Sequence, residues 1–283
     1  MEHIFQSVLL LSAAGSALAG ILLLFKPLTK RIFSSRWQYY IWLAVLVVMV
    51  LPIRFRIPAA HPANATLPHT ETQLPQGQAQ QAIQAAPAPK EASEMQTRTE
   101  DVRTGAQSAL FRRLLAITWA VGASVFFICG LLSYWRFLYI IRRHAAETVC
   151  PELDNAKAET HVRQSVVVKT TGMLTAPLLA GLFKPVLLLP AKKLDTKELH
   201  YILCHELTHL KRRDLWYKWF AMLVNAVHWF NPLMYLVTKQ INEECEISCD
   251  LSVTQHLNED GKKEYMNTII RLASVQKGGK ASV

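Results

Sequence analysis

The sequence is poor in cysteine, and this excludes one class of protein at the outset. It contains five cysteines, an odd number, and no CxxC pair, so it lacks the framework of a disulfide-stapled domain. Four of the five lie after the second apolar run and outside the apolar runs, which suits a reducing compartment. The sequence also contains no nucleic-acid-binding motif. Its net charge of +10 therefore indicates basic residues near anionic lipid, with no direct nucleic-acid partner.

Three long stretches contain no charged residue, and they hold much of the 51% hydrophobic content. They cover residues 4–25, 37–53 and 114–135. The first would be about 30 Å long as a helix, which is the thickness of a hydrocarbon core. It lacks the basic leader of a signal peptide, and a second run follows it closely. The sequence therefore predicts three membrane spans.

Basic residues set the expected orientation. The segment between the first two runs carries Lys26, Lys30, Arg31 and Arg36 and no acid, a density typical of cytoplasmic loops. The N-terminus is then outside, and everything after the third run is cytoplasmic. A loop rich in Ala, Gln, Pro and Thr cannot bury enough apolar surface to fold alone. The expected parts are spans one and two with their loop (1–57), a disordered extracellular loop (58–110), span three (111–137) and a cytoplasmic domain (138–283).

The cytoplasmic part has the pattern of a mixed α+β domain. Residues 165–169, 174–180 and 185–189 are expected to form short strands, and the prolines within or beside the last two favour an edge position. A helix is expected to begin after Asp195, with Glu198 completing a capping box, and to reach about Arg212. Further helices are predicted over residues 215–230, 232–256 and 262–275. The predicted architecture is a helical membrane bundle joined to an α+β domain with a small sheet.

The strongest chemical signal is the run HELTH at residues 205–209, which has the HExxH pattern. His205 and His209 are four residues apart, so on a helix both imidazoles can reach one ion. Two imidazole nitrogens would supply half of a tetrahedral zinc (Zn²⁺) site. Glu206 is the expected catalytic residue, a general base that takes a proton from the attacking water and passes it to the leaving amine. The motif predicts a zinc-dependent peptidase.

A third metal ligand is expected from the helix after Pro232. Glu243, Glu246 and Asp250 share one face of that helix. Glu246 and Asp250 form a pair in which one carboxylate could bind zinc and the other could orient a ligand histidine. Spacing does not choose Glu246 over Glu243 or Glu244. Cysteines 245 and 249 are an alternative source of a ligand, although such cysteines are usually small buried apolar residues.

Several motifs together resemble the BlaR/MecR family of bacterial antibiotic-sensing membrane metallopeptidases. The three spans match the arrangement of that family, so the resemblance covers nearly the whole chain. The motifs that carry it are TAP (175–177), GLFKP (181–185), LLLP (187–190), HELTHLKRRD (205–214), WFNPL (229–233) and EISCD (246–250).

The resemblance implies more than spacing alone can show. It implies a gluzincin-type fold in which Glu246 is the third zinc ligand and Asp250 lies behind the ligands, and an edge strand within residues 174–189 that binds substrate in extended form. It also implies a bacterial, multi-pass membrane location. The expected partners are the lipid bilayer and a cytoplasmic protein substrate, in this family a transcriptional repressor or the chain itself. A homodimer is kept as a further expectation.

The resemblance departs from the family pattern at the C-terminal end. Antibiotic-sensing members continue into a fourth span and an extracellular penicillin-binding domain, whereas this sequence stops at Val283. The expectation is either a truncated reading frame or a short member, and these residues do not support β-lactam sensing.

Two other functions compete with a signalling metalloendopeptidase. An intramembrane protease of the site-2 type would need its HExxH motif in an apolar span, but Lys197, Glu198 and Lys211 lie on the motif helix. A non-catalytic zincin-like signalling or assembly protein is the other alternative. All expected catalytic positions are filled, which favours the enzyme.

Overall fold

The computed structural model describes residues 2–51, 90–192 and 194–279. The chain divides into two compact units, one formed by residues 1–52 with 117–283 and the other by residues 53–116. In the second unit, the described residues belong to helix α4 (Lys90–His144), which continues into the first unit. Of the loop that was expected to be disordered, residues 58–89 lie outside the described residues. The expectation is wrong for residues 90–110, which are helical because they contain no proline and many strong helix formers.

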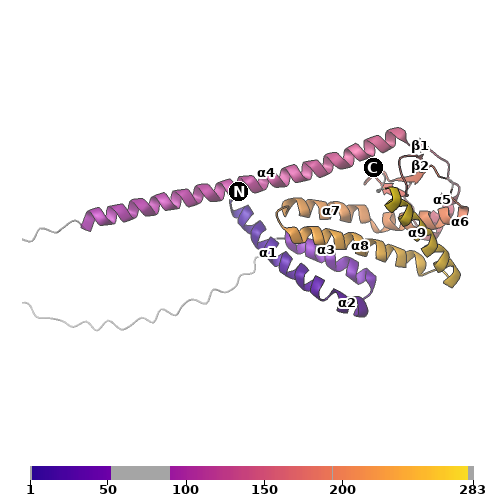
Figure 1. Cartoon of the computed structure of the whole chain (residues 1–283), viewed down its shortest axis with the longest axis horizontal. Helices are drawn as coiled ribbons and strands as arrows, with labels where there is room; N and C mark the ends of the chain where they lie inside the picture. Colours follow the sequence, from indigo (N-terminus) through magenta and orange to yellow (C-terminus); the bar gives the residue numbers. More distant parts are fainter. Residues whose placement is uncertain (1, 52–89, 193, 280–283) are drawn as a thin grey trace, which may run out of the picture. The chain divides into compact units, whose positions relative to one another are not determined.

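The N-terminal segment of the first unit packs against two helices from its C-terminal part. Helices α1 (Glu2–Leu24) and α3 (Ser35–Val50), joined by the short α2 (Lys26–Ile32), pack against α7 (Asp214–Val227) and α8 (Pro232–Thr254). Figure 1 shows these four long helices side by side. Their shared core is apolar and fully buried. It includes Trp42 and Leu46 of α3, Val224 of α7, and Met234 and Ile241 of α8.

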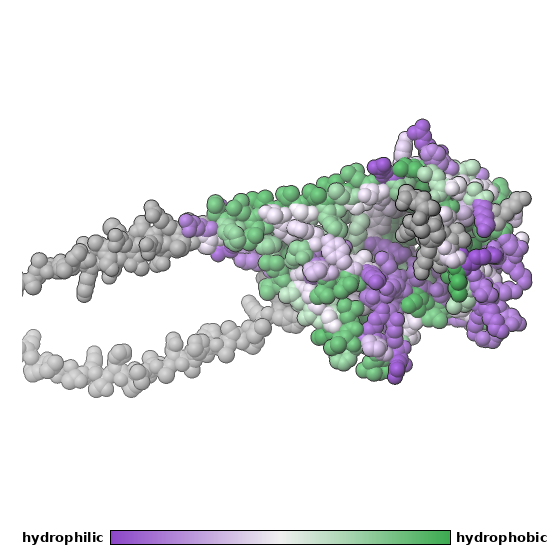
Figure 2. All heavy atoms as spheres, viewed as in Figure 1, coloured by the Kyte–Doolittle hydropathy of each residue, from purple (hydrophilic) through white to green (hydrophobic). Residues whose placement is uncertain are grey.

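Within the described residues, two helices are long and apolar enough to cross a membrane. They are α1 and the segment Gln107–His144 of α4, whereas α3 is apolar but has 16 residues. Much of the apolar surface of both faces outward, as the hydrophobic colouring of Figure 2 shows. Leu10 and Leu24 of α1 and Leu132 and Trp135 of α4 are all more than 60% exposed. The span predicted over residues 37–53, which α3 covers, therefore stays a prediction.

The remaining helices surround the sheet. The described chain contains α5 (Glu152–Thr160), which was not predicted, then α6 (Thr196–Arg212) and α9 (Glu259–Gly279). Asp195 is the residue before α6, as predicted, but its side chain makes no capping hydrogen bond. Asn231 does cap α8, because its side-chain oxygen accepts a hydrogen bond from the backbone N–H of Leu233 at 3.0 Å.

The small sheet has the strand order β1-β2-β4-β3, with β1 (Ala146–Glu147), β2 (Val167–Thr171), β3 (Leu178–Ala180) and β4 (Val186–Pro190). β2 and β4 are parallel, and the outer strands pair antiparallel to them. The edge position predicted from prolines holds for β3 but is wrong for β4, which is central and buried at every residue. Pro185 and Pro190 lie at the boundary and end of β4, where a missing N–H removes little from the ladder.

Helix α6 is fixed to this sheet by its apolar face. Leu203 and Leu207 of α6 are fully buried against Leu187 of β4 and against Tyr265 of α9. Burial of each such side chain stabilises the fold by roughly 1.5–3 kcal/mol. Because one face of α6 packs on the sheet, the HELTH residues can be presented at a fixed position toward β3 and α8.

The Asn231 side chain should contribute to stability in two ways. Besides capping α8, its amide nitrogen donates to the hydroxyl oxygens of Ser12 at 2.8 Å and Ser16 at 2.7 Å on α1. We expect Asn231→Ala to destabilise the protein by about 1–3 kcal/mol, because the cap is lost and the hydroxyl oxygens of Ser12, which is buried, and Ser16 lose their donor. Thermal unfolding in detergent measures this, with the exposed Asn242→Ala on the same helix as control. Equal melting temperatures for the two variants would contradict the expectation.

Candidate active site

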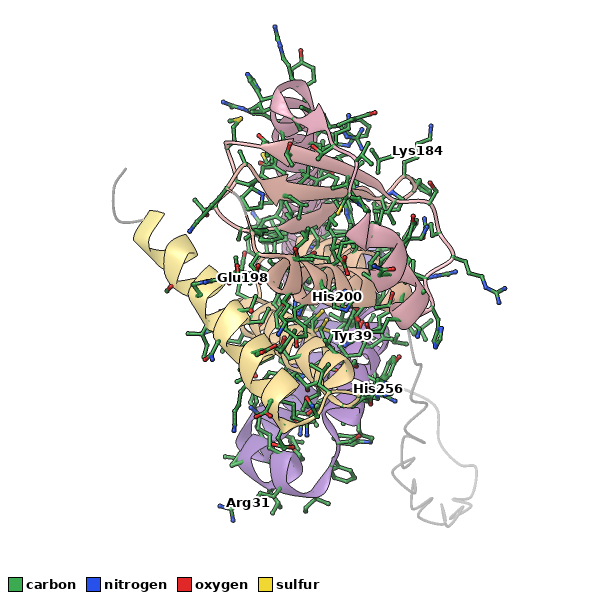
Figure 3. All side chains as sticks on the ribbon, turned by 90° about the vertical axis from the view of Figure 1, so that its right-hand side faces the viewer. Arg31, Tyr39, Lys184, Glu198, His200 and His256 are labelled. Carbon is green, nitrogen blue, oxygen red and sulfur yellow. The ribbon has the colours of Figure 1, made fainter. Side chains whose placement is uncertain are left out.

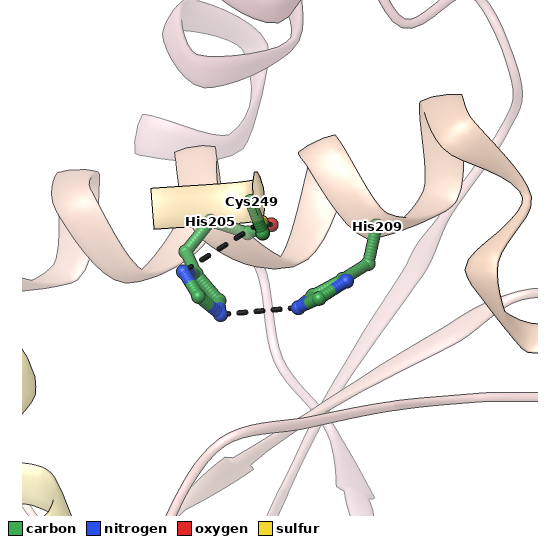
Figure 4. Close-up of side chains that lie close together, drawn as sticks. All are labelled: His205, His209 and Cys249. Carbon is green, nitrogen blue, oxygen red and sulfur yellow. Dashed lines mark hydrogen bonds between the residues drawn. The ribbon is translucent and has the colours of Figure 1, made fainter. Parts of the chain in front are cut away.

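The two histidines of the HELTH run face one another across a single gap. Helix α6 places them one turn apart, and their Nε2 atoms are 3.1 Å from each other. Both side chains are largely buried, with 12% and 9% of their surface exposed. Figure 4 shows the two rings with these nitrogens directed toward each other. The arrangement leaves both Nε2 atoms free to share one ion, as expected for a pair at i and i+4 on a helix.

Glu246 of α8 completes a three-atom cluster. Its Oε2 atom lies 3.5 Å from His205 Nε2 and 3.4 Å from His209 Nε2. Three ligand atoms of a tetrahedral zinc at 2.0–2.2 Å would be separated by about 3.3–3.6 Å. The three separations observed here agree with that spacing to within about 0.2 Å, so the donor set fits a metal ion of this size.

The other two candidate glutamates point elsewhere. Glu244 is buried, with Oε1 at 3.1 Å from the Lys26 ammonium group of α2, and Glu243 lies 3.6 Å from the same lysine. Successive residues of a helix are separated by about 100°, so Glu244 and Glu246 project from nearly opposite faces. Spacing left three neighbouring glutamates as candidates, and tertiary packing directs only Glu246 of the three toward the histidines.

A buried carboxylate orients His209. Asp214 Oδ2 is 2.7 Å from His209 Nδ1, while its Oδ1 accepts a hydrogen bond from the Tyr39 hydroxyl at 2.7 Å and lies 3.5 Å from Arg212 Nε. Arg213, between α6 and α7, adopts a left-handed conformation with φ of 59°. This residue ends α6 sharply and lets Asp214 begin α7 within reach of the ring.

A second hydrogen-bond network orients His205. The Tyr265 hydroxyl of α9 is 2.8 Å from His205 Nδ1 and donates to Asp250 Oδ1 at 2.6 Å. Asp250 Oδ1 is itself 3.2 Å from His205 Nδ1. In both histidines the nitrogen away from the gap is therefore occupied, which fixes the ring orientation and directs Nε2 toward Glu246.

Glu206 lies between the histidines in sequence and faces the sheet. Its Oε2 atom accepts a hydrogen bond from the backbone N–H of Leu179 at 3.0 Å. Leu179 is the middle residue of β3, the edge strand. A cavity of about 300 Å³ lies beside this region, and His209, Phe183 and Trp216 are among the residues that line it. The Glu206 carboxylate thus lies between the cluster of His205, His209 and Glu246 and the edge of β3.

Cys249 is the other candidate ligand on α8. Its Sγ atom lies 3.8 Å from His205 Nδ1 and within 3.4 Å of the His205 carbonyl oxygen. With both histidines it forms a group whose donor atoms all lie within 4.8 Å of one another, and Figure 4 shows its contact with His205. The Sγ contact is to the ring nitrogen that already faces Tyr265 and Asp250. Cys249 therefore packs behind His205, and Glu246 is the side chain that faces both Nε2 atoms.

The side chains around Glu246 stabilise its ionised form. Burial raises the pKa of the Glu246 carboxyl, but hydrogen bonds with His205 and His209 outweigh burial and lower it overall. Lys218 of α7 lies 3.3 Å from Glu246 Oε1 and acts in the same direction. Glu246 is therefore held as an anion, the form in which a carboxylate binds a cation.

Sequence reasoning found part of this constellation. The structure brings together His205, His209, Glu246 and Asp250 and places Glu206 beside them, whereas Asp214, Lys218 and Tyr265 were not predicted as site residues. Asp214 was present in the HELTHLKRRD run and could have been considered as a partner for His209. Tyr265 is 60 residues from its histidine and carries no motif, so nothing in the sequence pointed to it.

Comparison with known proteins gives a consistent match. The family model described as BlaR1 peptidase M56 matches residues 6–283. The regulatory protein BlaR1 of Bacillus licheniformis is 25% identical over 272 residues, which are 91% of this chain and 44% of that protein. BlaR1 of Staphylococcus aureus is 22% identical over 256 residues, or 88% of this chain and 43% of that protein.

A shorter similarity links the chain to a second regulator. The methicillin resistance mecR1 protein of Staphylococcus aureus is 29% identical over 112 residues, which are 38% of this chain and 19% of that protein. The chain therefore spans less than half the length of each of these curated relatives.

Removing the Asp214 carboxylate should weaken metal binding without removing a ligand. We expect Asp214→Asn to lower the affinity for a divalent transition-metal ion by about 10–100-fold, because the carboxylate behind His209 both orients the ring and raises its basicity. Competition with a chromophoric chelator measures the affinity, and circular dichroism checks the fold. Asp260→Asn, at an exposed position of α9, is the control. An affinity equal to that of the control would show that the bond behind His209 is not needed.

Proposed function

The chain belongs to the M56 family of BlaR1-type peptidases, and from this premise we propose that it is a membrane-bound zinc metalloendopeptidase of a signalling system. The observation that carries the proposal is the convergence of His205, His209 and Glu246, with the far nitrogen of each imidazole held by a carboxylate. The proposed substrate is a cytoplasmic regulator of the repressor type, the chain itself, or both.

The residues that would hold the zinc are His205 Nε2, His209 Nε2 and one Glu246 oxygen. The bound ion would polarise the scissile carbonyl and lower the pKa of the attacking water. Three protein ligands would leave a fourth position for water or substrate, as in catalytic rather than structural zinc sites. Asp214, Asp250 and Tyr265 would keep the two rings in place during turnover.

Glu206 is the proposed general base and acid. Its carboxylate is adjacent to the ligand pair and is held by the N–H of Leu179, which fixes one oxygen near the strand edge. As water adds to the peptide carbonyl, Glu206 takes one proton from it. When the C–N bond breaks, Glu206 gives that proton to the leaving amine nitrogen, so the carboxylate is restored.

The edge of β3 is the proposed binding surface for the peptide substrate. β3 pairs with β4 on one side, with Leu179 opposite Leu187. Its other edge is not paired with a strand within the described residues. An extended peptide could add to that edge as a further strand. Its backbone would then run next to Leu179 and the Glu206 carboxylate that Leu179 holds. The aromatic pair Phe183 and Trp216, with ring centroids 5.2 Å apart, would border a side-chain subsite.

The exposed apolar helices support a location in a membrane. Exposing an apolar surface such as that of α1 and α4 to water costs free energy, and contact with lipid tails avoids that cost. α3 is about 24 Å long at 1.5 Å per residue, shorter than the core of a bilayer, yet it packs between α1 and α8. We propose three spans in a bacterial cell membrane with the N-terminus outside. The basic residues of α2 and the catalytic domain would then face the cytoplasm.

The location of the motif argues against a site-2 type protease. The HELTH residues lie on α6, which packs on the sheet and is not one of the helices long and apolar enough to span a membrane. Lys197 at its start and Lys211 at its end are exposed. These features favour hydrolysis outside the hydrocarbon core.

Zinc content tests the metal site directly. We expect about one zinc per chain in protein purified in detergent, and a loss of most of it in Glu246→Ala, because two imidazoles alone bind the ion weakly. Glu243→Ala, three residues earlier on α8, should keep its zinc, and Cys249→Ser tests the thiolate alternative. Atomic absorption gives the stoichiometry. Zinc retained in Glu246→Ala but lost in Cys249→Ser would transfer the third ligand to the cysteine.

Loss of the general base should abolish turnover but leave the metal in place. We expect Glu206→Gln to lower cleavage of the chain itself, or of a co-expressed repressor-type protein, by about 10²–10⁴-fold with zinc content unchanged. Gel analysis of fragments over time measures the rate, and Glu259→Gln, at an exposed position of α9, is the control. Cleavage at the rate of the control would contradict the peptidase mechanism. A zinc-loaded wild type that cleaves neither protein would favour a non-catalytic signalling role.

A further inference from the structure

A second cavity lies on a different side of α6 from the cluster of His205, His209 and Glu246. It has a volume of about 550 Å³, and its walls come from the start of α3, the end of α5, α6 and the second half of α8. Cys204, Thr208 and Lys211 line it, and their spacing of four and three residues places them along one stripe of α6. None of His205, His209 and Glu246 lines this cavity. Its size is in the range of cavities that bind small molecules.

The cavity is strongly cationic. Arg36, Lys211 and Arg213 line it and each carries a positive charge. Within the described part of the chain, none of these three forms an ion pair with a carboxylate. Arg36 donates instead to the neutral side chain of Gln255 at 3.1 Å. The acid that lines the cavity is Glu159, whose Oε2 atom is already 2.9 Å from His200 Nε2. The net field inside therefore favours an anion.

Arg212 gives the most specific indication of what the cavity could bind. Its Nη1 and Nη2 atoms are buried and have no hydrogen-bond partner within the described residues. Nε faces Asp214 at 3.5 Å, and the guanidinium carbon lies 4.4 Å from the centroid of the Tyr39 ring. One edge and one face of the guanidinium group are thus occupied while four N–H donors are left unpaired. Buried donors on a charged group are rarely left without a partner.

We propose that this cavity binds a ligand that carries a phosphate group, with Arg212 as its central contact. A guanidinium presents parallel N–H donors that match two phosphate oxygens. Lys211, Arg213 and Arg36 supply the surrounding positive charge. The volume leaves room for a group attached to the phosphate, so the source is either an anionic phospholipid headgroup or a free phosphate compound. Tyr39 and His256, which also line the cavity, are labelled in Figure 3.

The proposal does not depend on the peptidase function. It uses none of the three proposed zinc ligands and would hold for a non-catalytic protein. Arg212 touches Asp214 through Nε alone, so a phosphate on the Nη side would leave that contact in place. Loss of zinc or of proteolysis would therefore leave the anion site standing, and loss of the anion site would leave the metal cluster standing.

Binding is tested with the full chain purified in phosphate-free detergent. Inorganic phosphate is titrated by calorimetry, with chloride at equal ionic strength as the reference. In parallel, the chain is placed in nanodiscs of phosphatidylcholine alone or with phosphatidylglycerol, and native mass spectrometry identifies retained lipid. Saturable phosphate binding assigns a free phosphate compound. Retention of phosphatidylglycerol without phosphate binding assigns a lipid headgroup. Neither binding nor retention would overturn the proposal.

Two variants test the assigned residues. We expect Arg212→Gln to weaken binding of whichever probe is active by roughly tenfold to a hundredfold, because charge-assisted hydrogen bonds are lost. The double variant Arg36→Gln/Lys211→Gln leaves the buried core intact and should weaken binding by about tenfold, which keeps the test decisive if Arg212→Gln does not fold.

The matched control is Lys239→Gln/Lys263→Gln. It removes the same charge from exposed positions of α8 and α9 and should bind like the wild type. Binding that is unchanged in both cavity variants, or equally weakened in the control, would show that the anion binds elsewhere or through net charge alone, and would overturn the proposal.

Discussion

The hydrogen bonds behind the two imidazoles are the constraint on which the rest of the site depends. A histidine ring on a helix can turn about its side-chain bonds, and only one orientation directs Nε2 into the shared gap. The hydrogen bond that Asp214 accepts from His209 and the network of Asp250 and Tyr265 at His205 select that orientation. Asp214 is completely buried, and a buried carboxylate is tolerated only when it is well paired. Its partners are His209, Tyr39 and Arg212, so the anchor of the ring is also a fixed point of the fold.

This anchor connects the N-terminal helices to the chemistry. Tyr39 belongs to α3, and its hydroxyl donates to the same carboxylate that holds His209. Helix α8 makes a second connection, because Glu244 reaches Lys26 of α2 while Glu246, on nearly the opposite face, reaches the histidines. A displacement of α2 or α3 would therefore act on the site through two charged contacts. The proposed phosphate cavity lies beside the first of these, since Arg212 contacts both Asp214 and Tyr39.

Much of the secondary structure followed from local pattern. The HELTH helix, the Asn-Pro start of α8 and the short strands were predicted within a few residues of their observed bounds. The failures have physical reasons. α5 is short and polar, so it carries no apolar period of its own, and the length of α4 was hidden because its polar N-terminal part resembles a loop in composition. The central position of β4 does not follow from its sequence, because prolines beside a strand are typical of sheet edges.

The sequence by itself determined that two imidazoles share one face of a helix, because spacing along a helix is local geometry, and that a glutamate follows the first of them. It also determined the long uncharged runs. Spacing left Glu243, Glu244 and Glu246 open, and the family resemblance pointed to Glu246. The tertiary structure decided that Glu246 faces those imidazoles, that Asp214 and Tyr265 lie behind them, and that four cations surround one cavity. These outcomes depend on how α6, α7, α8 and α9 are rotated against one another and against the sheet. That rotation is set by the packing of buried side chains that are far apart in the chain, such as Leu203 and Tyr265, and no short pattern encodes it.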